Sequence, residues 1–168
     1  MKLTKEVVKE ISTIKNEDEY MREFRLNSLN KFLELPLPNF GPKIEVDFDS
    51  INYYKKREDN LTNNWDNVSC EVRKLFNNLG VIDAEKKYLD GSGAQYDSEV
   101  IYHNMIKELD DKHVIFLDTD SAYRQYPELF KKYFNKLVKY DENKFTALNG
   151  AVWSGGTFIY IPPDTKLD

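Results

Sequence analysis

The 168-residue sequence has few of the side chains that usually build metal and cofactor sites. It contains one cysteine, Cys70, and two histidines, His103 and His113. A single thiol excludes an internal disulfide, and it cannot alone supply the several thiolates that hold a metal–sulfur cluster. The histidines are ten residues apart, a spacing that common zinc motifs do not use. We therefore expect no catalytic, cofactor-binding or metal site in this chain.

The sequence also lacks the signals of membrane, secreted and nucleic-acid-binding proteins. No apolar run approaches the length of a membrane span, and no signal peptide opens the chain. The formal net charge is −5, with acidic and basic residues mixed rather than gathered into a basic stripe. Hydrophobic residues make up 40% of the chain and aromatic residues 14%, so a folded core is expected. These features predict a cytoplasmic globular domain that binds neither membranes nor nucleic acid.

The spacing of apolar residues predicts an α+β fold, a mostly helical domain with a few short strands. Thr4 can cap the first helix, and Asn16 with Glu19 can form the capping box of the second. Ser98 can cap a later helix, although the alternation around it leaves a strand open there. The expected helices cover residues 5–14, 16–33, 69–79, 83–89, 98–109, 127–137 and 145–152. The expected strands cover residues 44–48, 113–117 and 157–161, and residues 60–67 are expected to form a loop.

The last part of the sequence, FTALNGAVWSGGTFIYIPP at 145–163, changes from helical to strand character. Ser154, Gly155 and Gly156 break the helical period, and the run at 157–161 is β-branched and aromatic without polar alternation. Such a run is typical of a strand buried on both faces, which needs neighbours on both sides. Because the sequence stops five residues after Pro163, we expect it to be the front part of a longer protein. An exposed strand at 157–161 could then support self-association.

Two blocks of the sequence resemble SufB, the scaffold subunit of the SUF iron–sulfur cluster assembly system and a member of the SufB/SufD family. They are GAQYDSEVIYHN at 93–104 and ALNGAVWSGGTFIYIP at 147–162. The resemblance covers only the N-terminal part of that family. It implies a mainly helical N-terminal domain at 1–142, followed at 143–168 by the entry segment of a truncated β-helix core.

The resemblance also implies a function for the longer family members. They join a SufC-like ATPase and a SufD-like paralogue, receive sulfur from a donor system, and assemble iron–sulfur clusters. The residues that handle iron and sulfur are expected beyond Asp168. Residues 1–168 would then hold no cofactor and have a structural or interaction role without catalysis.

Asp118-Thr119-Asp120 supports an enzymatic alternative, a Mg²⁺-dependent phosphohydrolase. It follows a strand-like run, where haloacid-dehalogenase-type phosphatases place an aspartate pair that attacks phosphorus and transfers the proton. Against this, Ala122 stands where that family has Thr or Val, and no convincing downstream Lys and acidic pair follows. The structural interpretation is that Asp118, Asp120 or Ser121 caps the next helix.

The remaining candidates also have structural interpretations. Cys70 lies at a predicted helix N-terminus, where the dipole could lower its pKa, but it also fits an exposed helix-start residue. His103 is expected to hydrogen-bond within the fold. Gly91-Ser92-Gly93 and Ser154-Gly155-Gly156 lack the residues that complete phosphate-binding loops, so both are interpreted as turns. Packing roles are expected for Trp65 and Trp153.

Overall fold

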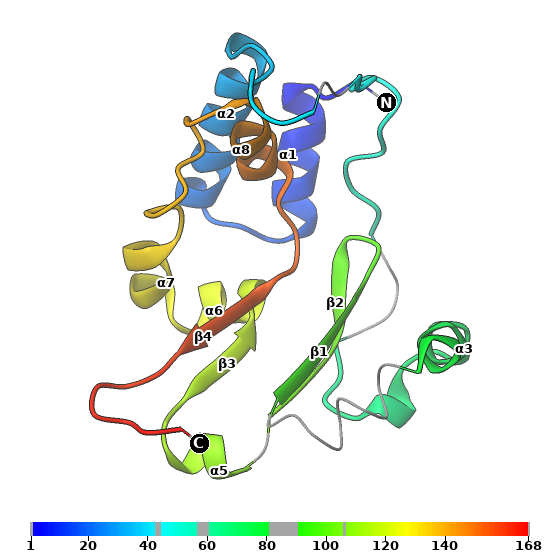
Figure 1. Cartoon of the computed structure of the whole chain (residues 1–168), viewed down its shortest axis with the longest axis vertical. Helices are drawn as coiled ribbons and strands as arrows, with labels where there is room; N and C mark the ends of the chain where they lie inside the picture. The colour runs from blue at the N-terminus through cyan, green and yellow to red at the C-terminus, as the bar shows by residue number, and fades with distance from the viewer. Residues whose placement is uncertain (1, 43–44, 57–60, 81–90, 106, 168) are drawn as a thin grey trace. The chain divides into compact units, whose positions relative to one another are not determined.

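A computed structural model describes residues 2–42, 45–56, 61–80, 91–105 and 107–167 (Figure 1). The chain folds as two compact units, each built from two separate segments. The first unit comprises Met1–Lys55 with Glu128–Trp153, and the second comprises Lys56–Pro127 with Ser154–Asp168. The expected division at residue 142 stays a prediction. No helix in the described ranges is long and apolar enough to cross a membrane.

The first unit is helical. Helices α1 (Lys5–Ile14), α2 (Glu19–Glu34) and α8 (Lys144–Val152) pack against one another (Figure 1). Helix α7 (Pro127–Tyr133) begins at a proline, as predicted, and its buried Phe130 stacks on Phe134 at 4.7 Å. The expected burial of Leu137 is wrong, because its side chain is 95% exposed. The core shared by the packed helices consists of Leu3, Val8, Leu29, Phe32, Ala147 and Ala151.

Local capping chemistry determines where these helices begin. The Thr4 hydroxyl accepts the Val7 N–H at 3.4 Å and caps α1, as predicted. The predicted Asn16 cap of α2 is wrong. Asp18 is the cap and accepts the Met21 N–H at 3.0 Å, whereas Asn16 adopts a left-handed conformation with φ 52°. Both are good capping residues, and the turn after α1 decides which one starts α2.

The second unit contains two antiparallel strand pairs. Strand β1 (Gly91–Tyr96) pairs with β2 (Glu99–Met105), with a register shift between Ala94 and Gln95. Strand β3 (Ile115–Asp118) pairs with β4 (Thr157–Tyr160), so that Asp118 lies opposite Thr157. The unit also contains a 3-10 turn, η1 (Trp65–Asn67), and the helices α3 (Cys70–Leu79), α5 (Lys107–Asp111) and α6 (Thr119–Gln125).

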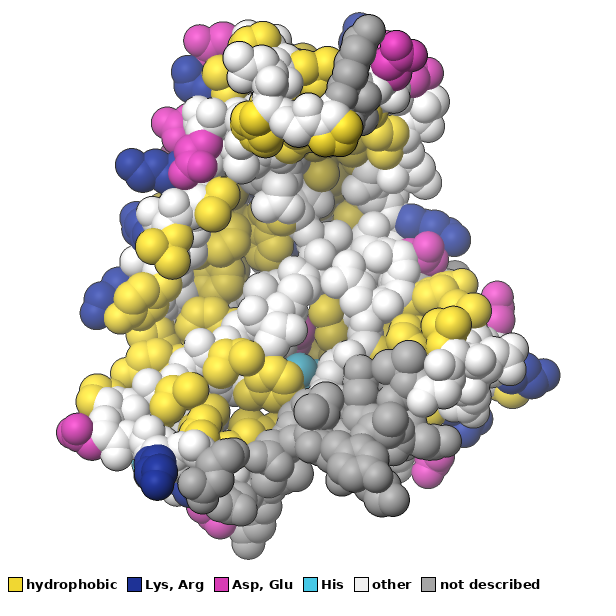
Figure 2. All heavy atoms as spheres, viewed as in Figure 1, with side chains coloured by type: hydrophobic (Ala, Val, Ile, Leu, Met, Phe, Trp, Pro, Cys, Tyr) yellow, Lys and Arg dark blue, Asp and Glu magenta, His cyan; other side chains and the backbone are white. Residues whose placement is uncertain are grey.

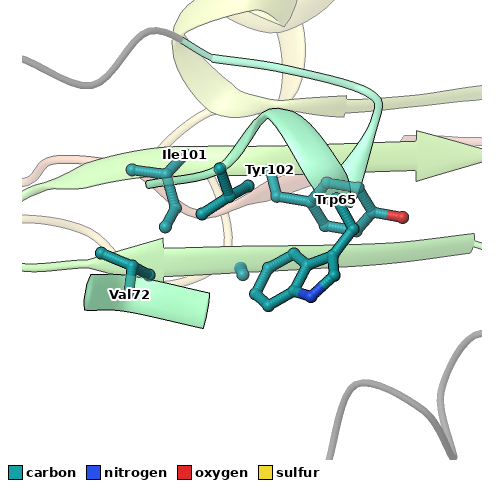
Figure 3. Close-up of a cluster of buried hydrophobic side chains, with 6 residues drawn as sticks. Trp65, Val72, Ile101 and Tyr102 are labelled. Carbon is teal, nitrogen blue, oxygen red and sulfur yellow. The ribbon is translucent and has the colours of Figure 1, made fainter. Parts of the chain in front are cut away.

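The hydrophobic core of the second unit lies between η1, α3 and the β1–β2 pair. The Trp65 ring meets the Tyr102 ring edge-on, with centroids 5.3 Å apart, and Ile101 and Val72 complete the contact (Figure 3). Gly80 ends α3 in the left-handed conformation, as predicted. Val72 is buried as expected, but Leu79 is 66% exposed, so only part of the predicted apolar face is covered.

The α+β expectation is confirmed: the described residues are mostly helical, with four short strands in two separate sheets. The helix expected from Ser98 is wrong, because residues 99–105 form β2 and Asp97 turns the chain with φ 54°. Residues 45–48 form no strand, and Ile44 of that prediction lies outside the described residues. The helix predicted at 83–89 also lies outside them.

Strand β4 confirms the strand predicted in the C-terminal segment, but its surroundings differ from the prediction. Burial on both faces is wrong, because Thr157 and Ile159 are exposed while Phe158 and Tyr160 are half-buried. The antiparallel partner β3 supplies a neighbour on one side. This apolar run therefore forms a strand with one exposed face. The sequence could not predict which face is exposed, because the run has no alternation of polar and apolar residues.

Candidate functional site

The two sequence blocks that carry the family resemblance meet at the glycine turn Ser154–Gly156 in the second unit. Gly155 and Gly156 have φ of +66° and +113°, a region that other residues rarely adopt. A Cβ on Gly155 would lie 2.6 Å from Oε1 of Gln95. The predicted turn is confirmed, and its positive φ angles depend on glycine; a Cβ at residue 155 would also require the Gln95 side chain to move.

Side chains from β1 and α6 hold this turn in place. The Thr119 hydroxyl donates to the Gly155 carbonyl at 2.6 Å, and the Thr119 N–H donates to the Gly156 carbonyl at 3.2 Å. The Gln95 amide donates to the Ser154 carbonyl at 3.5 Å. All three carbonyl groups of the turn therefore accept hydrogen bonds from β1 or α6, which agrees with its interpretation as a structural turn.

The first glycine segment does not form the predicted turn. Gly91, Ser92 and Gly93 lie within β1 and pair with Met105, Asn104 and His103 of β2. A Cβ on Gly93 would lie 3.5 Å from the Tyr102 carbonyl, which is ordinary contact. Gly93 therefore has neither a close contact nor a positive φ that would require glycine. Its extended conformation follows from the pairing of β1 with β2.

Asp118 acts as the helix cap expected under the structural interpretation. It is buried at the end of β3, and its Oδ1 accepts the Ser121 N–H at 2.9 Å at the start of α6. In the part of the chain that the structure describes, no group of three or more His, Cys, Asp or Glu side chains could hold a metal ion. The phosphohydrolase hypothesis stays a hypothesis, and Asp118→Asn tests it below.

His103 lies half-buried on β2, with its ring 4.5 Å from the Phe116 ring of β3. Burial lowers the pKa of His103, and the charge of Asp118 acts in the opposite direction. Its Nε2 is buried and has no hydrogen-bond partner in the described structure, so the predicted internal hydrogen bond is not found at that atom. His113 lies apart from it, exposed before β3 with φ 58°.

Cys70 is the first residue of α3, and its thiol is exposed and free. This agrees with the interpretation of an exposed helix-start residue. Iron–sulfur clusters are held by several thiolates, and the sequence contains one. The described residues therefore do not fit a cluster within a single chain.

Sequence reasoning missed the main buried polar group, Arg25 of α2. Its guanidinium bonds to both carboxylate oxygens of Glu17 at 2.7 and 2.6 Å, and it donates to the Ala151 carbonyl of α8 at 3.2 Å. It also lies 4.8 Å from the Trp153 ring centre. The Arg25 and Glu17 side chains are 0% and 4% exposed. The sequence did contain a sign of this burial, because Arg25 lies on the same helix face as the buried residues Met21, Leu29 and Phe32.

Lys144 makes a second, half-buried connection between the same helices. Its ammonium donates to the Phe32 carbonyl at 2.6 Å and to the Leu35 carbonyl at 2.9 Å. These acceptors belong to the last turn of α2 and to its cap, where a cation is favoured. Arg25 and Lys144 together fix α8 on α2 immediately before the glycine turn in the sequence.

Comparison with known proteins identifies the class. Residues 8–168 match the family model described as the SufBD protein N-terminal region. The chain therefore belongs to the SufBD family.

Two relatives from staphylococci show how much of the family the chain represents. It is 53% identical over 167 residues to an iron–sulfur cluster assembly SufBD family protein of Staphylococcus saprophyticus. It shows the same identity over the same length to a protein of that description from Staphylococcus aureus strain COL. Each alignment covers 99% of this chain and 36% of the relative. The chain thus spans about a third of the length of the curated relatives it matches.

Proposed function

We propose that residues 1–168 form the structural N-terminal region of a SufB-type scaffold for iron–sulfur cluster assembly, without catalysis of their own. The match of residues 8–168 to the SufBD N-terminal region carries this proposal. The description of the relatives as iron–sulfur cluster assembly proteins supports it. The finer assignment to SufB rests on the two blocks at 93–104 and 147–162.

In this proposal the cluster is cargo, assembled elsewhere in the longer protein. One exposed thiol in 168 residues supports a division of labour in which this region supplies no cluster ligands. The partners proposed for the whole protein are a SufC-like ATPase, a SufD-like paralogue and a sulfur-donor system. Their contacts are proposed to involve mainly the remaining part of the longer protein.

The proposed physical role of this region is to anchor the strand that leads into a β-helix. Arg25 and Lys144 hold α8, the glycine turn is held by Thr119, and β4 is paired with β3. These contacts hold α8 within the first unit, and they hold the glycine turn and β4 within the second unit. A β-helix has open strand edges at its ends, and a folded region at one end would protect them from aggregation.

A chimera tests the proposal. The segment of the S. aureus relative that this chain matches is replaced by residues 1–168, and the protein is reconstituted anaerobically with iron and sulfide. We expect the chimera to bind as much iron and sulfide per chain as the intact relative and to co-purify with the SufC-like ATPase. We expect residues 1–168 alone to bind neither. The relative without this segment is the matched control.

Cluster uptake by residues 1–168 alone would contradict the proposal. Cys70 would then have to be shared between chains, and Cys70→Ser would abolish the visible absorption of the cluster. A chimera that folds but fails to bind the ATPase or the cluster would show instead that this region has a more specific role than anchoring.

A further inference from the structure

His103 of β2 has a ring nitrogen without a hydrogen-bond partner in the described structure. Its Nε2 atom is buried, and its ring contacts the Phe116 ring of β3, with centroids 4.5 Å apart. Buried polar atoms in folded proteins are nearly always hydrogen-bonded, so an unpartnered one needs a physical explanation. The environment suits the neutral imidazole, because an unpaired charge costs far more to bury than an unpaired polar atom.

Asp118 is the acidic residue that acts on His103. Successive side chains of a strand point to opposite faces, so Phe116 and Asp118 lie on the same face of β3, about 7 Å apart along the strand. The face of β3 that contacts His103 therefore also carries the Asp118 carboxylate, and this residue is buried. The negative charge of Asp118 favours the protonated form of His103, against the effect of burial.

Among the described residues, the segments packed against His103 carry no charged side chain besides Asp118. Strand β1, which pairs with His103 at Gly93, has no acidic or basic residue, and neither do residues 115–117 of β3. Thr62, whose carbonyl accepts the His103 backbone N–H at 3.0 Å, is also uncharged. Figure 2 shows mainly hydrophobic side chains on the surface over β3 and β4. In such surroundings opposite charges attract each other more strongly than in water.

Asp118 has a second role, because it caps α6. Its Oδ1 accepts the Ser121 N–H at 2.9 Å, and Arg124 is a cation beside this cap, where it donates to the Ser121 hydroxyl at 3.4 Å. The first residue of α6, Thr119, holds the glycine turn through two hydrogen bonds. The carboxylate that attracts a charged His103 is therefore the same one that fixes the start of α6, next to the turn before β4.

We propose that His103 and Asp118 form a proton-dependent switch at the start of α6. When His103 is neutral, the carboxylate stays on the Ser121 N–H. When His103 takes up a proton from solvent, both ring nitrogens become donors, and the carboxylate turns toward the charged ring and accepts a hydrogen bond from it. The Ser121 N–H then loses its acceptor, and the contacts of Thr119 with the glycine turn weaken. The consequence for a strand that enters a β-helix rests on the proposed function, whereas the coupling itself is measured on residues 1–168.

An NMR titration of the 168-residue chain between about pH 7.5 and about pH 5 tests the coupling. His113→Gln assigns the imidazole signals of His103. We expect the pKa of His103 to lie below its usual value of 6.5, and the Ser121 N–H signal to shift with the same midpoint. The Phe145 N–H is the matched control, because the uncharged Asn143 side chain caps it at 2.9 Å and it should not follow that midpoint. A Ser121 signal that does not follow His103, or a His103 that stays neutral down to about pH 5, would overturn the proposal.

Hydrogen exchange at the Thr119 N–H separates the switch from simple burial of a histidine. The protection factor of this N–H should fall about fivefold from about pH 7 to about pH 5, which corresponds to the typical cost of losing a helix cap. Asp118→Asn keeps a capping side chain without the charge, so the protection should persist and His103 should bind its proton at least threefold more weakly. His103→Gln should also retain the protection in acid. The same loss of protection in either variant would show that the effect does not need this pair, and would refute the switch.

Discussion

Arg25→Ala should be among the most destabilising single substitutions in this chain. The guanidinium is fully buried and forms the bidentate pair with Glu17, the bond to the Ala151 carbonyl and the contact with Trp153. Removing the guanidinium leaves the Glu17 carboxylate buried without its partner, and the Ala151 carbonyl loses the hydrogen bond from Arg25. Loss of one member of a buried ion pair costs about 3–5 kcal/mol. Domains are typically stable by only about 5–15 kcal/mol, so a large part of the stability should be lost.

Equilibrium urea unfolding followed by tryptophan fluorescence measures this loss. Trp153 belongs to the first unit and Trp65 to the second, so Trp65→Phe leaves a reporter for the unit that contains Arg25. In that background we expect Arg25→Ala to lower the free energy of unfolding by about 3–5 kcal/mol at unchanged m-value. Lys31→Ala is the matched control. Lys31 pairs with Glu34 at the surface, so its loss should leave the free energy of unfolding nearly unchanged.

A double-mutant cycle separates the ion pair from the packing of the arginine stem. Arg25→Met keeps much of the apolar volume but leaves Glu17 unpaired, and adding Glu17→Gln removes that uncompensated charge. The double variant should therefore be more stable than Arg25→Met alone. Additive costs of the two substitutions, or a cost below about 1 kcal/mol for Arg25→Ala, would refute the account of a buried, coupled pair.

Three further predictions concern the interior of the two units. Gly150→Ala should destabilise the first unit by about 1–3 kcal/mol in urea unfolding, because the new Cβ would lie 2.6 Å from the Ser28 hydroxyl. Adding Ser28→Ala removes that hydroxyl and should restore part of the lost stability. A double variant that is no more stable than Gly150→Ala would contradict the predicted clash. Since burial lowers the pKa of His103, the unfolded chain takes up the proton first as the pH falls below about 6.5, so stability should decrease on acidification. His103→Gln should reduce the dependence of unfolding free energy on pH, and His113→Gln should leave it unchanged. The same pH dependence in both variants would refute the assignment to His103. Asp118→Asn should retain the helix cap and stability, and neither form should hydrolyse p-nitrophenyl phosphate with Mg²⁺; turnover lost only in Asp118→Asn would favour the phosphohydrolase.

Features that depend on a few neighbouring residues could be predicted from the sequence. The Thr4 cap of α1, the end of α3 at Gly80 and the start of α7 at Pro127 each follow from the conformational preference of one residue. The glycine turn at 155–156 was predictable for the same reason. The family could also be inferred, because the blocks at 93–104 and 147–162 are long and unusual.

Features that depend on residues far apart in the sequence were decided only by the tertiary structure. Ser98 could have capped a helix, but packing of Ile101 and Tyr102 on Trp65 favours a strand paired with β1. Arg25 would be interpreted as a surface residue, and its acceptor on Ala151 lies 126 positions away along the chain. Pairing and burial are long-range interactions, and the sequence around each residue does not specify its distant neighbours. For this reason the sequence determined several helix ends and the family, whereas tertiary contacts decided the β1–β2 hairpin, the buried ion pair and the pairing of β4 with β3.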